Sequence, residues 1–413
     1  MRVLLVHYSD NISRSGGGPI AMHRLHLGLK KANIDSKILC KVKTPDFADS
    51  VAIPPSQRIQ RLAESLIGRF TVPFGLQDMH CLSSFNIKDS PAYRDADILN
   101  FHGLQGGFFN YLALPSLTAD KPGVLTLHDM WPFTGHCSIS YDCERWKTGC
   151  GHCPYLDASP PVERDATRLE WKLKNWTYKR SKLAVITLST CRTEQVKQSM
   201  LNRFPIYQIP NGIDTEAYQP LDREQCRSLL GIPLKKHILL FAAAKLHQFN
   251  KGGDLLVNAL QNLPEGLKRE TVLLILGDHG DVLADAVGIQ TVNLGYVGSD
   301  RLKAIVYSAA DLFVLPTRAE SLPLVLQESM ACGTPLVSFR VGGVPDVVRP
   351  GMTGYLAEPE NAQDFCSGIV QLLEDSALRA WMGQQCRTIA VNEYALELQV
   401  QRYIELYQRL LKA

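Results

Sequence analysis

Two glutamates in the second half of the chain have the spacing and the setting of a ligand-binding pair. Glu320 and Glu328 lie in the run AESLPLVLQESMACG. A buried strand is expected to end at Pro316, and a helix to start near Pro323 and stop at Gly333. Two surface glutamates on one helix would be unremarkable. A glutamate between a strand and a proline-started helix, in so apolar a run, favours a site for a ligand with vicinal hydroxyls, because one carboxylate can accept two such bonds.

Groups that suit a phosphate are expected nearby in the fold. The amides of Leu324 and Val325, in the first turn of that helix, have no partners within the helix and are available to an anion. Lys245 and Lys251 lie on a loop that follows the strand KHILLFAAA, and Gly252 lies near the start of the next helix. Two ammonium groups beside helix-terminal amides would hold a diphosphate, whereas a random pair of lysines is usually just a solvated surface.

A histidine and a glycine loop follow two strands of the first half. His128 follows the strand GVLTL, where a neutral imidazole could bond a hydroxyl or lie near a reacting carbon, or simply be satisfied by a backbone carbonyl. From position alone the two interpretations are even. Gly16 and Gly17 open a helix after the first strand and would let the backbone approach an anion. The loop lacks the dinucleotide fingerprint and is weak evidence alone.

Four cysteines gather just after His128. They are spaced C-x5-C-x6-C-x2-C, at Cys137, Cys143, Cys150 and Cys153. We weigh three interpretations: one tetrahedral structural zinc, two disulfides, or four packed thiols. The zinc site is favoured, because a cytoplasmic chain disfavours disulfides and chance clustering is improbable. A closed shell of four thiolates leaves no open position, so this metal would clamp the long loop and take no part in catalysis.

The elements that must position these residues alternate between short β-branched runs and amphipathic stretches. This alternation predicts an α/β protein with parallel sheets, and 413 residues suit two domains. We expect two doubly wound, Rossmann-like domains, at 1–207, with a Cys-rich insertion at 136–156, and at 208–390. Residues 391–413 are predicted to form a closing amphipathic helix. Ligands of such sheets bind outside the carboxyl ends of the strands.

Bulk properties exclude some partners. A formal net charge of +3 gives no reason to expect nucleic acid, and the first apolar run is too short for a signal sequence. We therefore expect a cytoplasmic protein. The basic stretch RLEWKLKNWTYKRSK, with Trp171 and Trp176, could lie on an anionic membrane surface. A solvated helix with inward tryptophans is slightly preferred.

Taken together, the motifs resemble those of the family-4 retaining glycosyltransferases of the GT-B fold, over essentially the whole chain. Glu320 and Glu328 match the E-x7-E motif, supported by IPNGID, ADLFVLPT and VGGVPDVV. The resemblance implies a cleft between the domains, with Glu328 on the donor ribose and Glu320 on the transferred sugar. It assigns the donor diphosphate to Lys245 and Lys251, although the family usually has arginine in place of Lys245.

The resemblance assigns the remaining candidate residues as well. His128 would line the reaction site, Gly16 and Gly17 would close over the phosphates, and Val297, in NLGYVGSDRL, would lie near the base. The Cys-rich insertion resembles that of exopolysaccharide enzymes of the colanic-acid type.

The activity implied is transfer from a UDP- or GDP-linked sugar, with retention, to a glycan or lipid-linked acceptor. The acceptor would bring the enzyme into peripheral contact with the inner face of the cytoplasmic membrane. No cofactor or metal is expected in catalysis, since no Asp-x-Asp motif follows a strand. A GT-B epimerase and a non-catalytic scaffold of the same fold are the alternatives.

Overall fold

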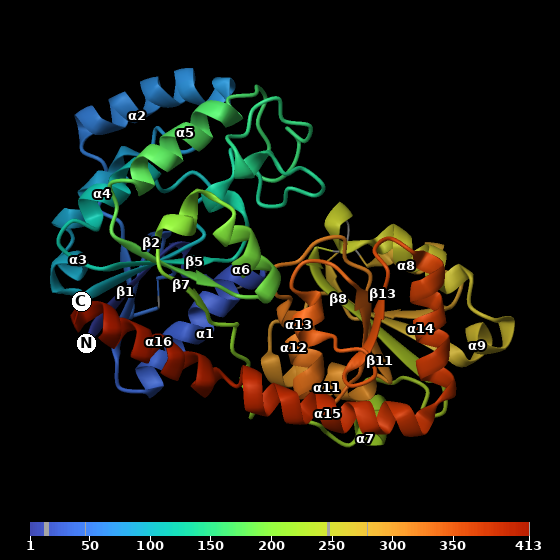
Figure 1. The fold of residues 1–413 in the computed structure, drawn as a ribbon. Helices are drawn as coiled ribbons and strands as arrows, with labels where there is room; N and C mark the ends of the chain where they lie inside the picture. Colours follow the sequence, from blue (N-terminus) through green and yellow to red (C-terminus); the bar gives the residue numbers. More distant parts are fainter. Residues whose placement is uncertain (12–15, 46, 246–247, 279, 413) are drawn as a thin grey trace. The chain divides into compact units, whose positions relative to one another are not determined.

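The computed structural model describes residues 1–11, 16–45, 47–245, 248–278 and 280–412, and the side chains at positions 244, 245 and 282 also lie outside this description. The chain divides into two compact units (Figure 1). The first contains the N-terminal strand, Gly18–Pro210 and the residues from Val400 onward, and the second contains Gly16, Gly17 and Asn211–Gln399.

The first unit is built on a parallel seven-stranded sheet of order β3-β2-β1-β4-β5-β6-β7. Its central strands are short and wholly buried, as expected for a sheet covered on both faces. The strands are β1 (Arg2–Ser9), β2 (Asp35–Val42), β3 (Ser50–Ala52), β4 (Ile98–His102), β5 (Gly123–Leu127), β6 (Leu183–Thr187) and β7 (Ile206–Gln208).

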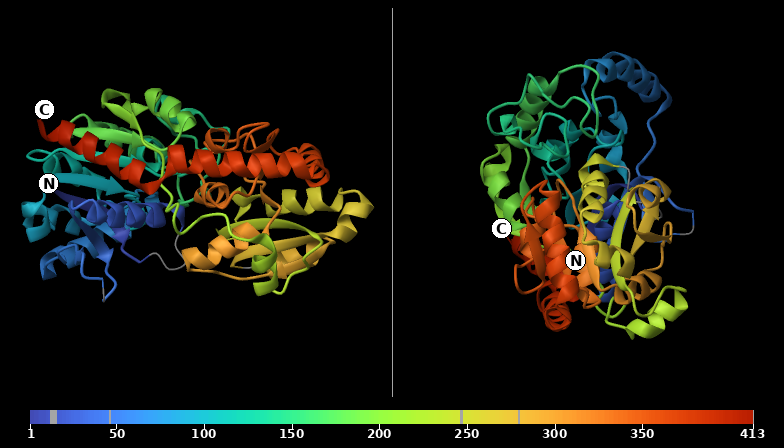
Figure 2. Two further views of the ribbon diagram at one scale, coloured as in Figure 1. Left: turned by 90° about the horizontal axis from the view of Figure 1, so that it is seen from below. Right: turned by 90° about the vertical axis from the view of Figure 1, so that its right-hand side faces the viewer.

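Helices connect these strands and surround the sheet, with α2 outermost at the edge of the unit (Figure 1, Figure 2). They are α1 (Gly17–Lys31), α2 (Arg58–Thr71), α3 (Pro91–Asp95), α4 (Leu114–Leu117), α5 (Thr167–Tyr178) and α6 (Thr190–Lys197). A large aromatic-rich core lies under the segment between β4 and α5, with Tyr111, Trp131 and Phe133 fully buried. This core supports the long loop that follows His128.

The second unit repeats the plan with six parallel strands in the order β10-β9-β8-β11-β12-β13. The strands are β8 (His237–Lys245), β9 (Thr271–Asp278), β10 (Gln290–Asn293), β11 (Leu312–Leu315), β12 (Leu336–Phe339) and β13 (Gly354–Ala357). The helices are α7 (Arg223–Leu229), α8 (Gly253–Gln261), α9 (Glu265–Glu270), α10 (Asp281–Ala286), α11 (Asp300–Ala309), α12 (Leu324–Ala331), α13 (Val344–Val347), α14 (Ala362–Glu374) and α15 (Ser376–Tyr394). The last helix, α16 (Leu396–Lys412), begins in this unit and continues into the first.

Strand order reverses once in each sheet, between β1 and β4 in the first and between β8 and β11 in the second. Connections leave the two strands of such a switch point in opposite directions, which opens a crevice at their carboxyl ends. The strands predicted from the sequence are all present. Four were missed: β2, β3, β7 and β10.

The end of the chain differs from the single closing helix predicted for residues 391–413. The helix α15 ends at Tyr394, and Ala395 has extended backbone angles before α16 begins. From Val400 onward the chain belongs to the first unit. There Tyr407 OH accepts a hydrogen bond from Asn100 Nδ2 at 2.8 Å, and Tyr403 OH lies 3.3 Å from Thr126 Oγ1. Within the described ranges, none of the helices has the length and apolarity needed to cross a bilayer.

Candidate functional site

The loop after β8 is held against the loop after β11, at the switch point of the second unit. The short 3-10 turn Phe249–Lys251 ends at Gly252, whose φ is +69°. A Cβ on Gly252 would lie 1.8 Å from the carbonyl oxygen of Pro316, so only glycine permits this approach. The Asn250 carbonyl accepts bonds from the Thr317 hydroxyl at 2.7 Å and from the amide of residue 318 at 2.8 Å.

This contact brings two predicted site residues together. Lys251 Nζ forms an ion pair with Glu320 Oε1, and both side chains are mostly buried, at 20% and 17% exposure. The glycine pair after β12, Gly342 and Gly343, packs against the backbone of Glu320. The Gly343 amide donates to the Glu320 carbonyl at 3.1 Å, and a Cβ on Gly342 would lie 2.0 Å from the same oxygen. The sequence therefore uses two glycine-dependent contacts to place one carboxylate beside one ammonium group.

Glu328 follows Glu320 by eight residues and lies on the next helix, α12. It is 3% exposed and accepts a hydrogen bond from Tyr307 OH at 2.9 Å. Pro323 is the N-cap of α12, so the helix begins one residue later than predicted. Leu324 and Val325 thus occupy the first two helical positions, where amides have no acceptor within the helix. This confirms the local geometry on which their assignment to a phosphate rests; the assignment itself stays a prediction.

Arg318 was not singled out from the sequence, although it fastens the two loops. Its guanidinium donates two bonds to the Asp254 carboxylate, at 2.8 and 2.6 Å, and its Nη1 donates to the Phe249 carbonyl at 2.9 Å. It also stacks over the Phe249 ring at 4.0 Å. The bonds from Arg318 lower the pKa of Asp254. The signal in the sequence was its place directly after β11, beside Glu320.

The other predicted donor residues are less fully placed. Lys245 is the last residue of β8, and its side chain lies outside the described part of the structure. Val297 lies half-buried in the loop after β10, and its place near the base stays a prediction. Gln327 of α12 donates to the carbonyl of Asn211 at 2.8 Å, so the IPNGID segment is anchored to the helix that carries Glu328.

In the first unit, three histidines end neighbouring strands. His7 is on β1, His102 ends β4 and His128 follows β5. His102 Nδ1 and His128 Nε2 are 2.9 Å apart, with one ring donating and the other accepting, and the rings stack at 5.2 Å. Burial lowers the pKa of all three rings, and that of His128 to about 3. The cluster is therefore neutral near pH 7, and His102 is a partner of His128 that the sequence did not reveal.

The glycine loop leads directly into this region of the first unit. Gly16 is exposed and precedes α1, which begins at Gly17, as predicted. Gly18 packs against the imidazole, since a Cβ there would lie 3.4 Å from His128 Cγ. The third glycine thus has a packing role with His128, whereas the phosphate role of Gly16 and Gly17 stays a prediction.

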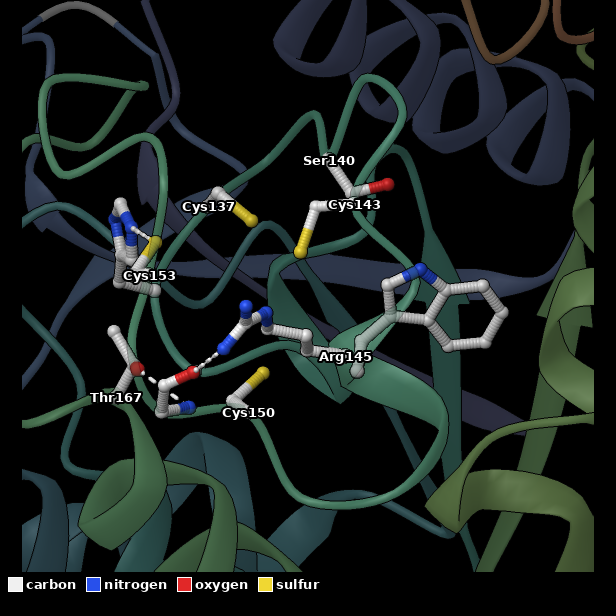
Figure 3. Close-up of a pocket in the computed structure, with 11 residues that line it drawn as sticks. Cys137, Ser140, Cys143, Arg145, Cys150, Cys153 and Thr167 are labelled. Atoms are coloured by element: carbon white, nitrogen blue, oxygen red, sulfur yellow. Dashed lines mark hydrogen bonds between the residues drawn. The ribbon is translucent and has the colours of Figure 1, made fainter.

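The four clustered cysteines line one pocket of the first unit (Figure 3). All four are free thiols, and His136 Nε2 lies 3.4 Å from Cys153 Sγ. In the described residues, however, no three Cys, His, Asp or Glu side chains are close enough together to hold a metal ion. The structure thus gathers the predicted ligands without arranging them as a coordination shell, and the zinc ion stays a prediction.

A buried lysine fixes the base of this loop. Lys174 of α5 is fully buried, and its ammonium donates to the carbonyls of Trp131 at 2.8 Å and Thr134 at 3.1 Å. It also lies 3.5 Å from the Trp131 ring centroid. Burial lowers the pKa of Lys174 to about 8, against the opposing effect of Glu170. A lysine in so basic a helix is ordinarily solvated, so the burial of Lys174 is a property of the fold that the sequence pattern did not reveal.

The two tryptophans of α5 have different environments. Trp171 is partly buried and its Nε1 donates to the Trp146 carbonyl at 2.8 Å. Trp176 is 47% exposed and lies under the guanidinium of Arg180 at 4.1 Å. The preferred interpretation of inward tryptophans therefore holds for Trp171 and fails for Trp176.

Two doubly wound parallel sheets in tandem define the GT-B class of glycosyltransferase fold. Solved structures share this architecture at low sequence identity. A sucrose-phosphate synthase from Thermosynechococcus elongatus has a TM-score of 0.72 and 19% identity, covering 100% of this chain and 99% of its own. Anabaena Alr3699/HepE in complex with UDP has a TM-score of 0.69 and 16% identity, covering 99% and 100%.

Comparison of the sequence with models of protein families identifies the superfamily within this fold class. The family described as Glycosyltransferase Family 4 matches residues 15–217, and Glycosyl transferases group 1 matches residues 222–388. The chain belongs to this group 1/family 4 superfamily of GT-B glycosyltransferases.

Curated relatives match a part of the chain. D-inositol 3-phosphate glycosyltransferase 1 of Catenulispora acidiphila is 33% identical over 220 residues, which are 46% of this chain and 52% of that protein. N-acetyl-alpha-D-glucosaminyl L-malate synthase of Bacillus anthracis is 28% identical over 216 residues, 50% of this chain and 54% of its own. The chain thus spans about half the length of the curated relatives it matches.

Proposed function

We propose that the protein is a retaining glycosyltransferase that moves a sugar from a UDP- or GDP-linked donor to a glycan or lipid-linked acceptor in the synthesis of a cell-surface polysaccharide. Membership of the superfamily supports the reaction class. The structure of Anabaena Alr3699/HepE in complex with UDP-glucose supports a nucleotide-sugar donor. The Cys-rich insertion is the sequence feature that favours the polysaccharide acceptor.

The observation that carries the proposal is the ion pair of Lys251 and Glu320 at the switch point of the second unit. A carboxylate alone would repel a diphosphate, and a lysine alone would be free to turn to solvent. Paired, each holds the other in position before the donor binds. The entering diphosphate then competes for the ammonium group, and the Glu320 carboxylate becomes available to accept bonds from sugar hydroxyls.

Glu328 serves a different part of the same donor in this proposal. Its carboxylate is buried and oriented by the hydroxyl of Tyr307, so it is preorganised to accept bonds from a ribose diol. The first-turn amides of Leu324 and Val325 face an anion at the start of the same helix. One short helix would therefore hold both the ribose and a phosphate.

Departure of the nucleoside diphosphate makes the largest electrostatic demand on the site. The ammonium of Lys251 and the helix-terminal amides stabilise the negative charge that builds on the leaving oxygen. The leaving diphosphate then helps to deprotonate the incoming acceptor hydroxyl on the same face, which retains the anomeric configuration. The neutral imidazole of His128 is suited to accept a hydrogen bond near the reacting carbon, since it carries no charge near pH 7.

The test uses Glu320→Gln, with Glu374→Gln at an exposed end of α14 as the matched control. Glu320→Gln is expected to lower transfer from the accepted nucleotide sugar by roughly 10²-fold or more. It should retain binding of the free nucleoside diphosphate, because the Lys251 ammonium is released from its partner. Lys251→Gln is expected to weaken that binding. Nucleotide release in a panel of UDP- and GDP-sugars measures transfer, and calorimetry measures binding.

Unchanged turnover of Glu320→Gln would contradict the proposal and favour the scaffold. Conversion of donor without any acceptor would favour an epimerase. The relatives named for inositol phosphate and malate suggest the informative acceptor panel, in which these small acceptors are compared with lipid-linked glycans. The anomeric proton coupling of the product, read by NMR, decides between retention and inversion.

A further inference from the structure

The helix α2 of the first unit exposes its apolar face to solvent. A surface helix of a globular protein normally buries its apolar face and exposes its polar one. None of the 14 residues of α2 is buried. Four large apolar side chains are strongly exposed on it: Ile59 at 82%, Leu62 at 63%, Leu66 at 60% and Phe70 at 66%. At 100° per residue these four positions form one continuous stripe.

The opposite face of α2 attaches the helix to the unit through polar and small groups. Glu64 Oε1 accepts bonds from the Ser56 hydroxyl at 2.6 Å and from the Ser83 amide at 2.9 Å. Gln60 exchanges two 2.9 Å bonds with the Asn86 amide. These bonds fix the rotation of the helix, so the apolar stripe is held outward by specific contacts. Figure 1 shows α2 (blue) at the edge of the first unit.

The stripe continues past the helix, and its border is positively charged. Val72 and Phe74, in the 3-10 turn that follows α2, are 53% and 52% exposed. Arg58 and Arg69 are exposed along one border of the stripe, whereas Arg61 is exposed further round the helix, towards the face of Glu64. The one acidic residue of α2, Glu64, takes part in the inward bonds. The outward surface of α2 therefore combines apolar and cationic groups without a carboxylate.

We propose that α2 and the turn after it, residues 58–74, dock the protein on an anionic lipid bilayer. Charge complementarity selects this partner, because anionic headgroups pair with the arginines while the acyl boundary accepts the apolar stripe. A helix of 14 residues is about 21 Å long, shorter than the ~30 Å bilayer core, so α2 lies in the plane of the surface.

This surface is a different one from the basic α5 segment indicated by the sequence. The inference draws its purpose from the proposed lipid-linked acceptor and stands on separate measurements, because docking needs neither donor nor acceptor. A failure of docking leaves the transferase proposal intact, and a failure of transfer leaves the docking surface intact.

The experiment measures co-sedimentation of the full chain with vesicles. The native protein is expected to bind vesicles that contain phosphatidylglycerol and to bind pure phosphatidylcholine weakly. Leu62→Gln/Leu66→Gln should weaken binding by roughly tenfold or more, because the apolar contact is lost. Arg58→Gln/Arg69→Gln should weaken it by roughly thirtyfold at low salt and remove most of its salt dependence.

The matched control is Leu229→Gln/Leu302→Gln, two leucines of the second unit that are 74% and 55% exposed. It should bind vesicles like the native chain. All of these side chains are exposed, so circular dichroism is expected to show intact folds. Absence of binding to anionic vesicles, or binding that the Leu62/Leu66 variant retains in full, overturns the proposal. Concentration-dependent dimerisation abolished by that variant, in sedimentation without vesicles, also overturns it, because the stripe would then be covered by a second copy.

Discussion

Replacing Gly252 with alanine is expected to destabilise the second unit far more than a matched glycine substitution does. Gly252 and Gly231 both have left-handed backbones, with φ of +69° and +65°. An added Cβ finds nothing within 4 Å at Gly231 but meets the Pro316 carbonyl oxygen at 1.8 Å at Gly252. Alanine therefore meets the same cost of a left-handed backbone at both positions. Only at Gly252 does its Cβ also clash with a neighbouring loop.

The magnitude follows from these two contributions. Placing alanine in the left-handed region costs about 1–2 kcal/mol at either position. At Gly252 the two loops must also part by more than 1 Å, because carbon and oxygen do not approach within 3.0 Å. Such overpacking adds about 1–3 kcal/mol. Loss of the two bonds to the Asn250 carbonyl would add about 1 kcal/mol each.

The assay is thermal unfolding of the two variants beside the native protein. For a unit of this size, 1 kcal/mol shifts Tm by about 2–4 °C. We expect Gly231→Ala to lower Tm by about 3–6 °C and Gly252→Ala by about 10 °C or more. Gly252→Ala should also weaken binding of nucleoside diphosphate, since Lys251 moves with the loop. Equal Tm shifts for the two variants would refute the argument that the contact with Pro316 fixes this loop.

Three further predictions concern the first unit. Because burial depresses the pKa of His102, folding favours the neutral ring, so the contribution of His102 to stability is full above pH 6.5 and is lost as the pH falls. His102→Gln should therefore reduce the slope of the unfolding free energy against pH, between pH 4.5 and 6.5, by up to ~1.4 kcal/mol per pH unit. An unchanged slope in urea titrations at these pH values would contradict this. Lys174→Met leaves two buried carbonyls and Glu170 without their cation and should lower the free energy of unfolding by roughly 3 kcal/mol. In a double-mutant cycle, adding Glu170→Gln should restore part of this loss, whereas additive losses would argue against coupling between the two side chains. Purified protein should contain about one zinc ion per chain. Cys150→Ser should release this ion, and Cys191→Ser, outside the cluster, should not. A metal-free protein whose four clustered thiols all react with a thiol reagent would contradict the zinc prediction.

The elements of the sheets could be predicted because their strands are short, buried on both faces and rich in Val, Ile and Leu. The strands that were missed lack that signature. β10 and β3 are edge strands with partly exposed positions, and β2 mixes lysines into its run. Residues at strand ends were also predictable as candidates, since topology alone brings them to one edge of a sheet.

Contacts made by polar side chains across the fold could not be predicted. Nothing local shows that Arg318 bonds Asp254, or that Lys174 of a basic helix is buried under Trp131. Each depends on where distant segments meet. The apolar residues of α2 were overlooked for the opposite reason, because periodicity identifies the apolar face of a helix but does not say whether protein covers it.

The return of the C-terminal helix to the first unit has a consequence for biosynthesis. Tyr403 and Tyr407 complete the packing around Asn100 and Thr126, on the central strands of that unit. During translation these strands emerge roughly three hundred residues before their partners. The nascent first unit must therefore remain incomplete while the second unit is synthesised, and a fragment ending near Pro210 would lack the side chains that cover Asn100 and Thr126.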